Sequence, residues 1–267
     1  MANSGQIRIG IGGWNFEPWE GTFYPDDLPK KRQLEFAGKE LRTIEVNGTY
    51  YSSQKPATFA KWASEVPDGF IFSLKASRFV TNRRVLSEAG ESVERFLTQG
   101  LTELGDRLGP ILWQFAPTKK FDAEDFEGFL KLLPDKQDGL KLRHVVEVRN
   151  PSFQVPDFVK LIEKYKVAVV LAEHADYPMI ADVTSDFVYA RLQKGSDEVK
   201  TCYPPKDLDR WAERLKSFAA GGEPDDLEKA ASERKPETAP RDVFAFFISS
   251  GKVNAPNGAR ELQKRVG

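Results

Sequence analysis

Residues 167–171, Val-Ala-Val-Val-Leu, form an apolar stretch that continues to Ala172 without a polar side chain. A strand that is apolar at every position is buried on both faces, which is typical of a parallel sheet covered by helices. This stretch is one of eight β-rich segments, and the predicted strands are 7–11, 43–46, 70–74, 110–115, 144–148, 167–171, 187–192 and 243–248.

The segments between these strands have the periodicity of amphipathic helices. They span 32–41, 57–66, 92–107, 123–133, 157–165, 208–218 and 257–266. Alternating strands and helices imply parallel crossovers, and eight such units in 267 residues favour an α/β fold that closes into a single (β/α)8 barrel. An open doubly wound sheet is the alternative. Residues 175–183 are too short for a regular helix and are interrupted by Pro178.

The composition fits one domain over residues 1–267, because 40% of the residues are hydrophobic and 30% are charged. Residues 221–242 are rich in Pro, Glu, Lys and Ala, and Leu227 is their large apolar side chain. We expect them to form a solvated insertion before the last strand, partly helical or mobile.

Charge and cysteine content exclude several classes of protein. The formal net charge is −1, which gives no overall field to attract nucleic acid or a membrane surface. Cys202 is the single cysteine, so no internal disulfide can form. The longest apolar runs are far below the roughly 20 residues that a membrane-spanning helix needs, and no basic, apolar leader opens the sequence. We therefore expect a cytoplasmic protein without a membrane partner.

Polar side chains gather at the carboxyl ends of the predicted strands. Side chains two residues apart in a strand point to the same side of the sheet. The residues that share a face in this way are Glu45 with Asn47, Ser73 with Lys75, Glu147 with Arg149, and Tyr189 with Arg191 and Gln193, while Gln114 ends the fourth strand.

Burying these charges together is costly unless they are paired or meet a ligand. Lys75, Arg149 and Arg191 outnumber Glu45 and Glu147 by one charge. We therefore expect a pocket for a polar or anionic small molecule, such as a carboxylate, a phosphate or a sugar that carries one. The alternative is a structural ion network that plugs the barrel.

Several motifs resemble the YecE-like family of uncharacterised bacterial and archaeal proteins. They are Ile9-Gly-Ile-Gly-Gly-Trp14, Trp19-Glu-Gly-Thr-Phe-Tyr-Pro25, Ile44-Glu-Val-Asn-Gly-Thr-Tyr-Tyr51, Phe70-Ile-Phe-Ser-Leu-Lys75, Leu108-Gly-Pro-Ile-Leu-Trp-Gln114, Val146-Glu-Val-Arg149, Tyr189-Ala-Arg-Leu192 and Ala255-Pro-Asn-Gly-Ala259. The resemblance covers nearly the whole chain. It implies a (β/α) barrel loosely similar to sugar isomerases, without an established reaction.

The matching positions supply a set of site residues that overlaps with the set chosen by strand parity. It comprises Trp14, Trp19, Tyr24, Glu45, Asn47, Thr49, Tyr50, Lys75, Gln114, Glu147, Arg149 and Arg191. The chain departs from the family where a histidine is usual, at Asn82 after Thr81 and at Gln193, and it has Ile248-Ser249 where an amide is common. Losing both imidazoles removes the side chains best suited to proton transfer near neutral pH.

Other kinds of site are less well supported by the sequence. The metal-ligand candidates Glu45, Glu147, Glu173 and His174 lie on three strands and compete with nearby cations, so a divalent metal is possible but not favoured, and no organic cofactor motif occurs. A phosphate could bind in the loops 194–196 and 249–252. Nucleic acid or a nucleotide is a further alternative, because Arg78, Arg83 and Arg84 lie beside Phe79. Cys202 has no histidine near it in sequence and is expected to be inert.

The leading hypothesis is an enzyme, or a descendant of one, that acts on a carbohydrate or its phosphorylated derivative. Glu147 would be the general acid or base, tuned by Arg149, and Lys75 would stabilise an oxyanion or donate a proton. The remaining site residues would bind substrate: Trp14, Trp19, Tyr24, Glu45, Asn47, Thr49, Tyr50, Asn82, Gln114 and Arg191. The rival hypothesis is a noncatalytic binding or scaffold protein.

Overall fold

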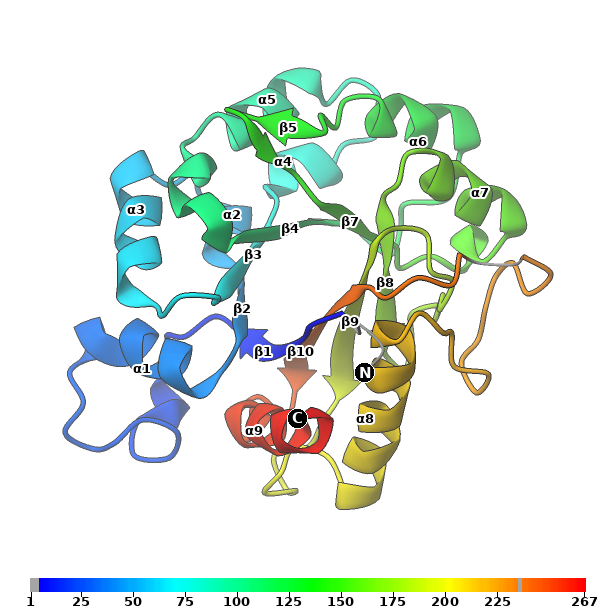
Figure 1. Ribbon diagram of the computed structural model, residues 1–267. Helices are drawn as coiled ribbons and strands as arrows, with labels where there is room; N and C mark the ends of the chain where they lie inside the picture. The colour runs from blue at the N-terminus through cyan, green and yellow to red at the C-terminus, as the bar shows by residue number, and fades with distance from the viewer. Residues whose placement is uncertain (1–4, 235–236) are drawn as a thin grey trace.

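The computed structural model describes residues 5–234 and 237–267 of the chain. Within these residues, eight parallel strands close into a barrel, so the predicted fold class is confirmed (Figure 1). In order around the barrel the strands are β1 (Ile7–Gly12), β2 (Thr43–Val46), β3 (Ile71–Lys75), β4 (Leu108–Gln114), β7 (His144–Glu147), β8 (Ala168–Glu173), β9 (Phe187–Lys194) and β10 (Asp242–Ser250), which pairs again with β1.

Helices surround the barrel (Figure 1). They are α1 (Gln33–Glu40), α3 (Pro56–Glu65), α5 (Gly90–Leu97), α6 (Ala123–Leu130), α7 (Pro156–Lys164), α8 (Pro205–Ala219) and α9 (Ala255–Val266), with the one-turn helices α2 (Gly48–Tyr51) and α4 (Arg78–Thr81) after β2 and β3. Their starts follow local rules: Asp122 caps α6 by accepting from the backbone N–H groups of Glu124 and Asp125. A proline lies in the first turn of α3, α7, α8 and α9, where it costs no helical hydrogen bond.

Two elements differ from the sequence-based expectation. The helix predicted over 92–107 is wrong as a single element, because Gly100 has φ 102° and separates α5 from a 3-10 helix over Leu101–Arg107. A small antiparallel hairpin of β5 (Lys136–Gln137) and β6 (Leu140–Lys141) lies outside the barrel and was not predicted. Two-residue strands are too short to leave a periodic signal in the sequence.

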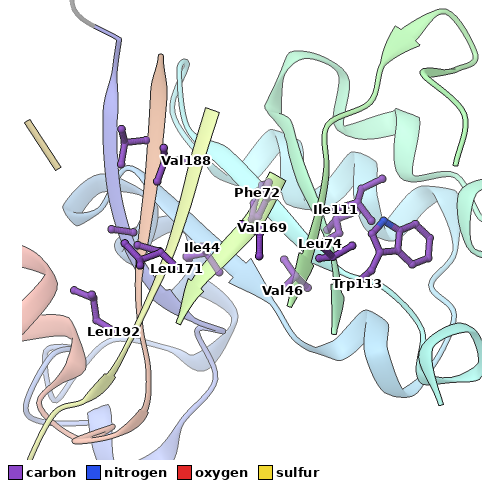
Figure 2. Packing of buried hydrophobic residues seen from close by; sticks show 14 of the residues in the cluster. Ile44, Val46, Phe72, Leu74, Ile111, Trp113, Val169, Leu171, Val188 and Leu192 are labelled. Atoms are coloured by element: carbon purple, nitrogen blue, oxygen red, sulfur yellow. The ribbon is translucent and has the colours of Figure 1, made fainter. Parts of the chain in front are cut away.

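Alternate strand residues point outward and pack against the helices. Figure 2 shows part of this layer, and its labelled side chains are Ile44, Val46, Phe72, Leu74, Ile111, Trp113, Val169, Leu171, Val188 and Leu192. The other parity fills the barrel with a second apolar cluster, which includes Leu112, Val145, Val170, Phe187 and Phe246. The polar residues of the candidate site form the next layer of the barrel interior, at the carboxyl ends of the strands and adjacent to this inner cluster.

The barrel lacks a regular helix between β8 and β9, as the broken pattern of residues 175–183 predicts. Residues after α8 return to this flank, shown in orange in Figure 1. The carboxylate of Asp182 accepts hydrogen bonds from the backbone of Ala230 and Ala231, at 2.7 and 3.1 Å. Arg234 donates to the carbonyl of Val183 at 2.7 Å. Residues 180–184 lie beside Val169 and Leu171 of β8 where a helix is absent, and the returning segment hydrogen-bonds to them, with the N–H of Ala181 donating to the carbonyl of Glu228 at 2.9 Å.

The returning segment is the stretch that the sequence marks as an insertion, 221–242. Its described part contains no helix and ends where β10 begins at Asp242. Leu227 is buried, and Arg241 donates to three backbone carbonyls, those of Gly221, Gly222 and Glu237. Residues 235–236 of the predicted insertion lie outside the described residues.

Across the described ranges, no helix combines the length and the apolar character needed to cross a lipid bilayer.

Candidate active site at the barrel mouth

Arg191, on β9, joins the two acidic side chains of the barrel interior. Its Nε and Nη2 atoms donate to the carboxylate of Glu45 on β2, at 3.1 Å each, in a bidentate pair. Its Nη1 atom donates to Glu147 on β7. All three side chains are buried. One guanidinium on β9 therefore links β2 to β7 across the barrel interior and offsets much of the cost of burying two carboxylates.

Glu147 is held as an anion by its neighbours. Gln114 donates to one carboxylate oxygen at 2.6 Å, and Arg149 donates to the other at 3.0 Å. Burial alone acts to raise the pKa of Glu147, but Arg191, Arg149 and the bond from Gln114 outweigh it and lower the pKa to about 2. A carboxylate this acidic and fully enclosed is a poor proton acceptor near neutral pH. The geometry therefore does not favour the acid–base role expected for Glu147.

Tyr189, two residues before Arg191 on β9, holds Glu45 by a hydrogen bond. Its hydroxyl donates to Glu45 Oε2 at 2.8 Å and lies 2.8 Å from the hydroxyl of Ser73 on β3. Ser73 in turn donates to the carbonyl of Pro110 at 2.9 Å. Burial, followed by the charge of Glu45, raises the pKa of Tyr189 well above its ordinary value, so this phenol stays protonated. The hydrogen bond from the Tyr189 hydroxyl thus fixes the position of Glu45.

Lys75, at the end of β3, differs from the other charged residues of the interior. In the part of the chain that the structure describes, its ammonium has no hydrogen-bond acceptor within 3.5 Å and no carboxylate within 4.0 Å. Its Nζ atom lies 4.4 Å from the centre of the Tyr50 ring. Only 9% of its surface is exposed. Burial, then the nearby charge of Arg191, lowers the pKa of Lys75 to about 8. Lys75 is therefore the group of the cluster closest to exchanging a proton near neutral pH.

Short-range contacts also hold the backbone at Lys75. The hydroxyl of Thr49, in α2, donates to the carbonyl of Lys75 at 2.7 Å and to that of Val46 at 3.1 Å. The Tyr50 ring that faces Lys75 Nζ follows directly in the same helix. The one-turn helix α2 thus positions both the main chain and the aromatic neighbour of Lys75.

A cleft of about 710 Å³ opens above this cluster, and we call it the mouth cleft. Four cationic side chains reach it, namely Lys75, Arg149, Arg191 and Lys252, whereas no Asp or Glu of the described residues lines it. The other lining residues are Gly12, Gly13, Trp14, Asn15, Trp19, Val46, Asn47, Gly48, Tyr51, Gln54, Trp62, Gln114, Phe247, Ile248 and Ser249. Because Glu45 and Glu147 are enclosed beneath their arginines, the mouth cleft presents positive charge to a ligand.

Aromatic side chains form one wall of the mouth cleft. Trp14, just after β1, meets Trp62 of α3 edge to face with ring centres 5.3 Å apart. Trp19 lies behind them, buried, and its indole N–H donates to the carbonyl of Lys252 at 2.8 Å. An apolar wall beside cationic groups suits a ligand with both a charged group and a carbon face.

Five residues that the sequence assigns to binding do not line the mouth cleft. Glu45, Thr49 and Tyr50 contact Arg191 or Lys75 beneath it, whereas Tyr24 and Asn82 lie elsewhere. Tyr24 is buried outside the mouth cleft, and its hydroxyl donates to the carbonyl of Trp14 at 2.7 Å, so it supports the aromatic wall. Asn82 ends α4 and lines a separate cavity with Arg78 and Arg83. Both assignments rested on the family resemblance alone, and neither residue is on a barrel strand whose parity fixes its direction.

The loops after β9 and β10 do not offer the phosphate site considered from sequence. The carboxylate of Asp197 accepts from the backbone N–H of Val253 at 2.8 Å and of Asn254 at 3.4 Å, immediately before α9. An anion already occupies these donors, which leaves less for a phosphate. Ser249 and Lys252 nevertheless face the mouth cleft from the same loop.

Metal ligands are sparse. Within residues 5–234 and 237–267, no group of three or more His, Cys, Asp or Glu side chains is arranged to hold a metal ion. His174 stacks on Tyr177, with ring centres 3.8 Å apart, and its Nδ1 accepts from the backbone of Asp176 at 3.0 Å. Tyr177 in turn lies under the guanidinium of Arg149, at 4.5 Å. His174 therefore packs near Arg149 only indirectly, through the ring of Tyr177.

The cleft residues that the sequence did not assign to the site include Asn15, Gln54 and Trp62. Asn15 and Gln54 lie in loops, where side-chain direction follows no period. Trp62 lies in a helix whose pattern indicates core packing, and that helix indeed packs on the barrel, but Trp62 reaches its open end. Trp14, Trp19 and Trp62 all lie in the first 62 residues, and this clustering was the signal that could have pointed to Trp62.

The fold and site together define a (β/α)8 barrel protein with a cationic cleft at the carboxyl ends of its strands. The chain belongs to DUF72, described as a family of proteins of unknown function, whose model matches residues 8–267. Because YecE is also a DUF72 member, the resemblance seen in the sequence is confirmed at the level of this family.

Individual relatives agree with this assignment over nearly their whole length. UPF0759 protein YunF of Bacillus subtilis (strain 168) is 24% identical over 276 residues, which cover 96% of this chain and 94% of that protein. A solved DUF72 family protein from Enterococcus faecalis V583 has a TM-score of 0.71 at 17% identity and covers 98% of both chains. Another from Thermotoga maritima MSB8 has a TM-score of 0.71 at 20% identity and covers 97% of this chain and 98% of that one. These structures support the fold alone.

Proposed function

We propose that this protein is an enzyme that binds a small anionic molecule, a carbohydrate acid or a phosphorylated carbohydrate, in the mouth cleft and moves a proton on it. The observation that carries the proposal is the charge of the cleft: four cations line it, and the acids nearby are enclosed by arginine. The oxygen atoms of an anionic ligand would replace the hydration that these cations lose in the cleft. The aromatic wall of Trp14 and Trp62 suits the carbon face of a sugar.

The roles of the residues follow from their contacts. Arg149 uses Nε and Nη2 for Glu147 and lines the cleft, so it is placed to hold the anionic group. Lys75 stabilises an oxyanion or donates a proton. Glu45 and Glu147 act as positioning residues that orient the arginines. A sugar-isomerase-like transfer of a proton between neighbouring carbons fits these roles, and we place the reaction in the cytoplasm.

The test compares ligand binding with turnover. Wild-type protein is screened by thermal shift and calorimetry against sugar phosphates, sugar acids and the matching neutral sugars. We expect anionic ligands to bind at least about 10-fold more tightly than neutral ones, which corresponds to about 1.4 kcal/mol. Arg149→Met should remove this preference, whereas the control Arg210→Met, in an exposed pair with Asp207, should keep it. Equal affinity of wild type for neutral and anionic sugars would contradict the proposal.

A noncatalytic binding protein is the second candidate. It is favoured by the absence of imidazole from the described lining of the mouth cleft, and by Gln193, whose buried Nε2 finds no partner within the described ranges. Both candidates predict binding, so the distinguishing measurement is product formation. Bound ligands are incubated with wild type and with Lys75→Met and followed by NMR. Conversion by the wild type alone supports the enzyme, and unchanged ligand with both proteins supports the binding role.

A further inference from the structure

We propose that Lys75 is a nucleophile that forms an imine with an anionic aldehyde or ketone bound in the mouth cleft. This inference rests on the proposed function and adds a covalent step and a substrate class to it. The carbonyl compound would carry a carboxylate or a phosphate, as open-chain sugar acids and sugar phosphates do.

The first support is the isolation of the Lys75 amine. Arg191 and Arg149 hold both buried carboxylates, so no described acid is left to pair with Lys75 within 4.0 Å. A lysine with so little exposed surface is normally paired with an acid, because removing a lone ammonium from water is costly. Lys75 is instead left beside other cations, an arrangement that activates amines for attack on carbonyl groups.

The second support is the position of the amine. Lys75 lines the mouth cleft while only 9% exposed, so a ligand reaches it through the cleft. Arg149 and Lys252 line the same cleft and can hold the anionic group. The Tyr50 ring, 4.4 Å from Nζ, would stabilise the positive charge of a protonated imine by a cation–π contact.

The third support is the protonation state, because only the neutral amine attacks a carbonyl. Burial and Arg191 lower the pKa of Lys75 to about 8. At pH 7.5 about a quarter of such an amine is neutral, against about one part in a thousand for an ordinary lysine. The reactive fraction is therefore on the order of 100-fold larger.

The step balances without a cofactor. The nitrogen lone pair of neutral Lys75 bonds to the carbonyl carbon, the π electrons move to oxygen, and that oxygen takes the proton leaving nitrogen to give a carbinolamine. The carbon–oxygen bond then breaks, nitrogen forms the double bond to carbon and gives up its second proton, and the hydroxyl leaves as water. No oxidation occurs. The imine, once protonated, draws electrons from the neighbouring carbon and so makes its hydrogen easier to remove.

The test is reductive trapping on the full-length protein. Pyruvate supplies a carboxylate beside a ketone, and glycolaldehyde phosphate supplies a phosphate beside an aldehyde, so the two probes separate the two anionic groups. Each is added with sodium cyanoborohydride at pH 7.5, and peptide mass spectrometry locates the reduced adduct. We expect the adduct at Lys75 with at least one probe, formed on the order of 100-fold faster than at exposed lysines.

Two variants make the outcome decisive. Lys75→Arg keeps the charge and should abolish the specific adduct, while Lys61→Arg, at an exposed lysine of α3, should leave it unchanged. The rate of trapping should level off above about pH 8. An adduct spread evenly over lysines, or one at Lys252 in place of Lys75, would overturn the proposal.

Binding measured in the same samples separates this inference from the function on which it rests. If the probes raise the melting temperature of wild type and of Lys75→Arg, and no adduct forms, the cleft binds anions but Lys75 is not a nucleophile. If the probes neither bind nor label, both the imine and an anionic carbonyl substrate are rejected.

Discussion

Replacing Arg191 by methionine tests the central claim about the barrel mouth, that one guanidinium makes two buried carboxylates tolerable. Methionine keeps an unbranched side chain like the aliphatic part of arginine but lacks the guanidinium and its charge. The variant leaves Glu45 with the hydroxyl of Tyr189, and leaves Glu147 with Gln114 and Arg149. Removing one partner of a buried ion pair costs about 3–5 kcal/mol. Because Arg191 serves two acids, we expect the free energy of unfolding to fall by about 4 kcal/mol at pH 7.5.

The assay is urea denaturation at pH 7.5 and at pH 5, with Arg210→Met as the matched control. Arg210 makes an exposed pair with Asp207, and such pairs contribute about 0–1 kcal/mol. The cost of Arg191→Met should shrink at the lower pH, because a carboxylate without its cation can be relieved by a proton. Adding Glu45→Gln to Arg191→Met should restore part of the loss.

Two results would refute this reasoning. If Arg191→Met costs no more than Arg210→Met, the buried acids do not depend on the guanidinium. If the cost is large but equal at both pH values, lost packing rather than uncompensated charge is responsible.

Three further predictions concern stability. The neighbours of Glu147 lower its pKa from 4.5 to about 2, so the ionised carboxylate stabilises the fold above pH 4.5, and this stabilisation is lost as the pH falls from 4.5 towards 2. Glu147→Gln should therefore reduce the loss of unfolding free energy between pH 4.5 and 2, measured by urea denaturation. An unchanged pH dependence in the variant would assign the loss to other groups. Tyr189→Phe removes a buried donor to the β2 carboxylate and should cost about 1–3 kcal/mol in urea denaturation, whereas a neutral result would show that the hydroxyl is dispensable. Gly10→Ala places a Cβ atom 1.9 Å from the carbonyl oxygen of Thr43 and should lower the melting temperature sharply or prevent folding, while Gly48→Ala, with no atom within 4 Å, serves as the control; equal melting temperatures would contradict the close approach of β1 and β2.

Barrel strands were predictable because their side chains obey a strict period. The predicted 43–46 coincides with β2, and 144–148 differs from β7 by one residue. The same period predicts that Lys75, Arg191 and Glu147 lie on the inner face, and the structure brings them together at the mouth. Parity predicts such a cluster because each strand contributes its carboxyl end to one layer.

What the sequence could not supply was the partner of each charge. Arg149 was expected to tune Glu147 for proton exchange, but the pair is locked together with Arg191, and Lys75 is left unpaired among the described residues. Strand parity gives direction but not distance, so it cannot decide which cation takes which acid. Loop residues such as Tyr24 and Asn82 were placed by resemblance alone, and the structure locates neither in the mouth cleft.

The substitute for a helix beside β8 has a consequence for how the chain folds as it is made. Asp182 can accept its hydrogen bond from Ala230 only after 48 further residues have been synthesised, so the flank of the barrel beside β8 stays incomplete until then. Domains emerge from the ribosome amino end first, so a nascent chain that ends at α8 lacks the segment that hydrogen-bonds to residues 180–184 beside β8, as well as β10, which closes the barrel. A segment that looks dispensable by composition is thus needed to complete this flank of the barrel, and a version shortened within it should aggregate during synthesis before any effect on the mouth cleft could be measured.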